Sequence, residues 1–140
     1  MIRESVKNRF QVMVKKSYYI KQRYNLDFTF ALLYHKHPID VVELSQFIRI
    51  SDLIIDIDDN HYFIIYQFTD MQETLKATQN LIFNLDKFFN EAGSSYVAID
   101  KLDDTVSPMN LLSRLKQIVN YAKTNKINRV ETEEVLDYDI

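Results

Sequence analysis

Apolar and polar positions follow a helical period in several stretches of this chain, and β-rich runs without that period lie between them. A helical period covers residues 5–24, where an apolar face lies among lysines and arginines and Asn25 marks the end. A second helical stretch begins after Thr69 or Asp70 as its cap, with apolar residues alternately four and three positions apart as far as Phe89. We expect Gly93 to end this helix as its C-cap. These two stretches predict the longest helices of the fold.

Two further helices are predicted from their starting residues. Asp40 can cap a helix that carries Glu43 at the position of a capping box and ends near Ser51. Ser107 followed by Pro108 is a strong start for a last helix, which has apolar residues on one face.

Strands are predicted where β-branched and aromatic residues gather without helical period, in residues 27–35, 53–57, 62–68, 95–102 and 127–135. Turn-forming residues 58–61 make a hairpin of the second and third. The expected fold is therefore α+β, a sheet of about five strands packed with helices. We expect one domain over residues 1–140, with an N-terminal amphipathic helix (1–24), a core (25–135) and an acidic tail (136–140).

Composition excludes several classes of protein. The chain has 140 residues with 46% hydrophobic residues and a net charge of -3, which argues against disorder and makes a nucleic-acid partner unlikely. It has no cysteine, which excludes disulfides and fits a cytoplasmic protein. No apolar run is long enough to span a membrane. Gly93 is the only glycine, so no glycine-rich loop can cradle a nucleotide.

Short motifs near the hairpin and at the C-terminus resemble the diguanylate cyclase (GGDEF) family. Arg49-Ile50-Ser51-Asp52 looks like the RxxD stretch of that family, and Leu53–Ile57 separates it from Asp58, where the signature would begin. Residues 121–130 look like the closing YxAKxxGxNRV segment, and Asn8-Arg9 is similar to an opening Asn-Arg pair. The resemblance covers nearly the whole chain and implies a ferredoxin-like, nucleotide-cyclase-like fold of bacterial signalling proteins.

The departures from that family concern the catalytic centre. The resemblance implies a hairpin with two glycines and metal-binding carboxylates, but here the turn reads Asp58-Asp59-Asn60-His61-Tyr62-Phe63. Paired aspartates are expected at the end of the first strand, where residues 34–38 read Tyr-His-Lys-His-Pro. Phosphoryl transfer depends on positioning and on metal ions. We therefore expect no enzyme activity and no cofactor, and a non-catalytic regulatory or protein-interaction module.

The sequence offers two candidate binding sites, and the residues of each could instead have a purely structural role. In the family the RxxD stretch binds cyclic di-GMP, so Arg49 and Asp52 are candidate ligand residues, although such a pair is commonly only a solvated ion pair. The family topology would also bring His35, His37 and His61 together with Asp59, a donor set that suits a transition metal and would permit metal-dependent chemistry. The alternative is that these histidines are polar replacements at loop ends.

The first helix is the expected contact surface for a homodimer or a signalling partner. Its candidate interface residues are Phe10, Lys15, Tyr18, Tyr19 and Tyr24. Its basic side chains could also be neutralised by acidic residues 131–139, within one chain or across a dimer.

Overall fold

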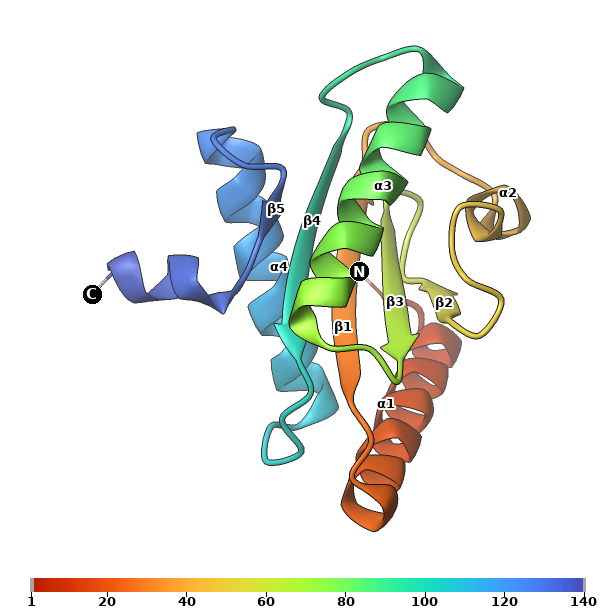
Figure 1. Ribbon diagram of the computed structural model, residues 1–140, viewed down its shortest axis with the longest axis vertical. Helices are drawn as coiled ribbons and strands as arrows, with labels where there is room; N and C mark the ends of the chain where they lie inside the picture. The colour runs from red at the N-terminus through yellow and green to blue at the C-terminus, as the bar shows by residue number, and fades with distance from the viewer. Residues whose placement is uncertain (1, 140) are drawn as a thin grey trace.

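The computed structural model describes residues 2–139, without the side chains of residues 137–139, and is built on a five-stranded mixed sheet of order β2-β3-β1-β4-β5 (Figure 1). Neighbouring strands are antiparallel, except that β4 and β5 are parallel. The predicted α+β sheet is therefore confirmed. The strands are β1 (Phe28–His35), β2 (Leu53–Asp56), β3 (His61–Gln67), β4 (Ser95–Lys101) and β5 (Val130–Glu131).

Helices cover both faces of this sheet. On one face lie α1 (Glu4–Tyr24) and α4 (Pro108–Asn125), and on the other lie α2 (Val41–Ser45) and α3 (Met71–Phe89) (Figure 1). The side chains of β1 point alternately to the two faces of the sheet, so that Phe30 packs on the α1 side and Leu33 packs on the α3 side. The central strands are therefore apolar on both faces.

Helix α3 begins as predicted but ends earlier than expected. Asp70 accepts from the backbone N–H of Glu73, whose side chain accepts from the N–H of Asp70, which completes a capping box. The C-cap is Asn90 at φ 49°, not Gly93. Asparagine tolerates this left-handed conformation, which explains why a glycine was not needed there.

Two other predicted elements are shorter than expected. Helix α2 has only five residues, because Gln46, Phe47 and Ile48 donate to carbonyls three residues back, which tightens the chain into turns. The predicted strand 127–135 is reduced to β5, and Glu133–Asp139 forms the 3₁₀ helix η1. Val135 is buried in the α1/α4 core, which favours this turn over continued pairing.

The described acidic side chains of the C-terminal segment, those of Glu131, Glu133 and Glu134, form no ion pair with the basic first helix. Helix η1 contacts α4 and β4, whereas α1 contacts α4 and β2. Among the described side chains, the ion pair recorded for α1 joins Lys21 to Asp27. The acidic groups of Asp137 and Asp139 lie outside the described side chains. No helix within residues 2–139 is long and apolar enough to cross a membrane.

Candidate functional site: the β2–β3 hairpin and the end of β1

In the turn between β2 and β3, the carboxylate of Asp58 is hydrogen-bonded to other residues of the same turn. One carboxylate oxygen of Asp58 accepts hydrogen bonds from the N–H groups of Asn60 at 2.9 Å and His61 at 2.8 Å, and it lies 2.9 Å from His61 Nδ1. Partial burial acts to raise the pKa of Asp58, but the hydrogen bonds from Asn60 and His61 together outweigh it, so its pKa lies below the ordinary value. Asp58 is thus used to shape the turn.

The same turn is tied to the end of β1. The backbone N–H of His35 donates to the carbonyl of Asn60 at 2.9 Å, and the side-chain amide of Asn60 donates to the carbonyls of His35 and Lys36. The family topology inferred from the sequence placed these two segments side by side, and this is confirmed. The end of β1 and the hairpin turn are therefore joined by hydrogen bonds into one edge, which lies where these strands end.

His35 is buried in that edge, and both of its ring nitrogens are engaged. Nδ1 lies 2.8 Å from the carbonyl oxygen and 3.0 Å from the backbone N of His37, and Nε2 lies 3.1 Å from Ser94 Oγ, whose hydroxyl donates to the carbonyl of Glu91. The ring also packs against Phe89 at 4.5 Å between centroids. His35 therefore acts as a core residue of the β1 end.

His37 lies on the same side as His35, with 5.8 Å between the two ring centroids, near the end of helix α3. Its Nε2 lies 3.0 Å from a carboxylate oxygen of Glu91, and its ring stacks on Phe89 at 5.6 Å. Lys36 also pairs with Glu91, at 3.2 Å. Hydrogen bonds from His37 and Lys36 hold the pKa of Glu91 below its ordinary value. Glu91 and Ser94 were not predicted as part of this site, since nothing in the sequence links the loop between α3 and β4 to the end of β1.

The predicted metal site of His35, His37, His61 and Asp59 is wrong. His35 and His61 point to opposite faces of the sheet, because His61 faces Tyr34 across the β1–β3 pair and side chains alternate along β1. His61 pairs with Asp58 rather than Asp59. Within residues 2–139 no group of three or more histidine or acidic side chains is placed to hold a metal ion.

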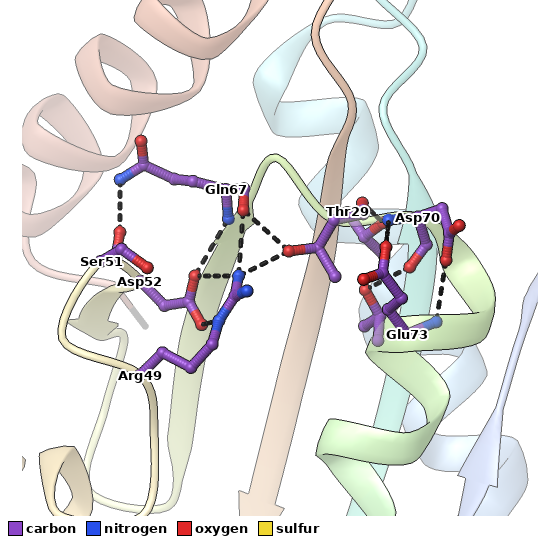
Figure 2. A network of polar contacts seen from close by, with 9 residues as sticks. Thr29, Arg49, Ser51, Asp52, Gln67, Asp70 and Glu73 are labelled. Carbon is purple, nitrogen blue, oxygen red and sulfur yellow. Dashed lines mark hydrogen bonds and ion pairs between the residues drawn. The ribbon is translucent and has the colours of Figure 1, made fainter.

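Arg49 and Asp52 form an ion pair in the connection between α2 and β2, which we call the clamp (Figure 2). Arg49 Nε and Nη2 each donate to a different oxygen of Asp52 at 2.8 Å. Nη2 also donates to the carbonyl of Gln67 at 2.9 Å and to Thr69 Oγ1, and the N–H of Gln67 donates to Asp52 at 3.1 Å. The side chain of Asp52 has 0% exposure, whereas that of Arg49 has 50%. The pair therefore joins the α2–β2 connection to the end of β3.

The predicted interface residues of α1 divide into two groups. Phe10 is fully buried against Phe63, with 4.7 Å between ring centroids, and Tyr18 is buried with its hydroxyl donating to the carbonyl of Val106 at 2.8 Å. These two residues belong to the core and cannot contact a partner, so that part of the prediction is wrong. Lys15, Tyr19 and Tyr24 are exposed. Their role in an interface stays a prediction.

A prediction follows for the pH dependence of stability. Burial lowers the pKa of His35 below the value of 6.5, and His37 adds to this, while the hydrogen bond with His37 and the carboxylates Glu91 and Asp86 oppose it. The unfolded chain therefore binds the proton first, so we expect the free energy of unfolding to fall as pH drops below about 6.5. Urea titrations between pH 5 and 8 would measure this.

The matched variants for that experiment are His35→Gln and His61→Gln. The first removes the buried imidazole and should flatten the pH dependence near pH 6, whereas the second changes a partly exposed ring and should leave it in place. An unchanged pH profile in His35→Gln would contradict the assignment.

No protein-family model matches the sequence, and no curated protein matches it. Solved structures do match, and the similar ones are GGDEF domains. The GGDEF domain of DgcB from Caulobacter crescentus, solved in complex with c-di-GMP, is 10% identical with a TM-score of 0.71, covering 89% of this chain and 88% of that one. The FimX GGDEF domain from Pseudomonas aeruginosa is 10% identical with a TM-score of 0.68, covering 89% and 91%.

A third similar structure is the GGDEF domain of TpbB, also named YfiN, from Pseudomonas aeruginosa. It is 12% identical with a TM-score of 0.65, and the match covers 98% of this chain and 92% of that one. At such identities the likeness concerns the fold alone. The chain therefore has the fold of a GGDEF domain, as the short motifs had indicated.

Proposed function

We propose that this chain is a GGDEF-derived domain that has no cyclase activity and acts as a regulatory or protein-interaction module. The observation that carries the proposal is the turn of the β2–β3 hairpin. It contains no glycine, and the carboxylate of its first aspartate, Asp58, is already hydrogen-bonded to Asn60 and His61. Binding of a nucleoside triphosphate at this place would require close backbone approach, which the absence of glycine disfavours, and carboxylates free to bind a metal ion, whereas Asp58 is engaged within the turn.

The end of β1 supports the same proposal. Where the resemblance implies a pair of aspartates, the chain carries His35 and Lys36, and His35 is buried between Ser94 and Phe89. A neutral, buried imidazole cannot replace a carboxylate as a ligand of a magnesium ion, which prefers oxygen. Two separate parts of the catalytic centre are thus replaced by residues that serve the fold.

The test is incubation of the purified protein with GTP and Mg²⁺ or Mn²⁺, with an active GGDEF domain assayed in parallel. Chromatography should show that GTP is retained and that no cyclic di-GMP forms, while the active domain converts the same substrate. Formation of cyclic di-GMP at the expense of GTP, in a preparation where denaturation of this chain abolishes it, would refute the proposal.

A second candidate function is reception of cyclic di-GMP through the Arg49-Asp52 stretch. The observation in its favour is that half of the Arg49 side chain is exposed beside β2, and the similar DgcB domain was solved with c-di-GMP. The buried carboxylate of Asp52 argues the other way, because its hydrogen bonds to Arg49 and Gln67 would have to break before it could accept from guanine.

A further inference from the structure

The outward side of α1 carries a stripe that the core does not use. Arg9, Val12, Lys16, Tyr19 and Arg23 recur at alternating spacings of three and four, which places them on one side of the helix. All five are exposed, Val12 by 52% and Tyr19 by 57%. We refer to these five residues as the outer stripe.

The outer stripe alternates in chemistry as well as in position. Its cations Arg9, Lys16 and Arg23 are seven residues apart, and Val12 and Tyr19 lie between them, also seven apart. The seven-residue spacing keeps these positions in register along one side of the helix, so a second helix lying along α1 would meet cationic and apolar side chains alternately. The opposite face of α1, with Phe10 and Val14, is already buried against the sheet.

The cations of the outer stripe have no counter-ion among the side chains that the structure describes. Among the described side chains, none of the ion pairs involves Arg9, Lys16 or Arg23. Arg23 lies over the ring of Tyr24, 5.8 Å from its centroid. Glu4 is the only acid of the helix, and it lies in the first turn, away from most of the stripe. The stripe therefore presents a positive potential that complements an acidic surface.

We propose that the outer stripe of α1 is the docking surface for an acidic amphipathic helix of a different protein. That partner would carry Glu or Asp seven residues apart, opposite Arg9, Lys16 and Arg23, and apolar side chains between them, against Val12 and Tyr19. This inference rests on the proposed function as an interaction module and names the chemistry of its partner. Helix-on-helix recognition of this kind buries the apolar positions and uses the charges to select the partner.

A second copy of this chain does not fit the outer stripe. Two copies packed in parallel would place Arg9, Lys16 and Arg23 against themselves, and two antiparallel copies would place Arg9 against Arg23. Either arrangement brings like charges together, which opposes association. A nucleic acid fits less well than a helix, because Val12 and Tyr19 would occupy every second position along a surface that phosphates should line.

The probe is a synthetic 21-residue helical peptide with Glu at the three heptad positions that face the cations and Leu at the positions between. A control peptide has Lys in place of these Glu residues. Titration into the ¹⁵N-labelled full chain should give saturable shifts confined to α1 and its neighbours with the Glu peptide, and none with the Lys peptide. Shifts centred elsewhere, or equal binding of both peptides, would overturn the inference.

Charge reversal separates the outer stripe from overall charge. The variant Arg9→Glu/Lys16→Glu/Arg23→Glu should weaken binding of the Glu peptide by about tenfold or more and should gain binding of the Lys peptide. The matched control, Lys76→Glu/Lys101→Glu/Lys126→Glu, changes net charge equally at exposed sites on other elements and should bind as the wild type does. Loss of binding in both variants would mean that only net charge matters, which would overturn the inference.

Two further experiments test whether a nucleic acid or a second copy of this chain binds the outer stripe instead. Tighter binding of a DNA duplex than of the Glu peptide, sensitive to the same triple reversal, would replace the helix with a nucleic acid. Sedimentation that shows a dimer abolished by the triple reversal would replace it with a second copy. Either result would overturn the inference without affecting the proposed lack of cyclase activity, which is decided by GTP turnover alone.

Discussion

Replacing Arg114 by Met should lower the free energy of unfolding by about 3–5 kcal/mol. Asp100 on β4 is only 3% exposed, and Arg114 on α4 supplies the two N–H groups that reach it, Nε at 2.8 Å and Nη2 at 2.5 Å from the same carboxylate oxygen. Methionine keeps much of the side-chain volume but leaves the buried carboxylate without its guanidinium. Urea denaturation followed by circular dichroism would measure the loss, with an unchanged slope.

The double variant Asp100→Asn/Arg114→Met is the control, because it removes the charge as well as its partner. It should be more stable than Arg114→Met alone. Burial raises the pKa of Asp100 even though Arg114 opposes this, and the single variant should raise it further. A carboxyl whose pKa is raised on folding destabilises at pH above that pKa, so Arg114→Met should gain stability on acidification. Equal losses in both variants, without this gain, would contradict the assignment.

The architecture was predictable because its signals are local. The cap at Asp70, the start of α4 at Ser107 and the run of aromatic and β-branched residues in β1 each depend on a few neighbouring residues. The ends of elements were not predictable in the same way. Asn90 rather than Gly93 ends α3, and a buried Val135 turns the C-terminal segment into η1. The first depends on which of several residues near the helix end takes the left-handed conformation, and the second depends on tertiary packing, which a sequence pattern does not record.

The position of the hairpin turn beside the end of β1 was predicted correctly, but the metal site expected there was not. The hairpin turn does lie beside the end of β1, as the topology implied. The metal site failed because His35 and His61 sit on paired strands one register position apart, where side chains point to opposite faces. Burial of Phe10 and Tyr18 was likewise hidden, because the first helix has an apolar face that could serve either a core or an interface.

Replacing Arg49 by Met should destabilise the protein by about 2–3 kcal/mol, less than the Arg114 variant, because half of the Arg49 side chain is in water. The variant leaves the carboxylate of Asp52 buried with only the N–H of Gln67 as its donor among the contacts described above. Arg49→Lys should recover little of the loss, since an ammonium cannot make the two parallel bonds that the guanidinium makes.

The same variant decides between a structural clamp and a cyclic di-GMP site. A clamp predicts that Arg49→Met lowers the melting temperature by the same amount with and without the dinucleotide, and that the wild type gains nothing from it. A receptor predicts that the wild type gains about 2.7 kcal/mol at a ligand concentration one hundred times the dissociation constant, and that Arg49→Met loses this gain. We expect the first pattern, because ligand binding would have to open a bidentate ion pair whose carboxylate is fully enclosed.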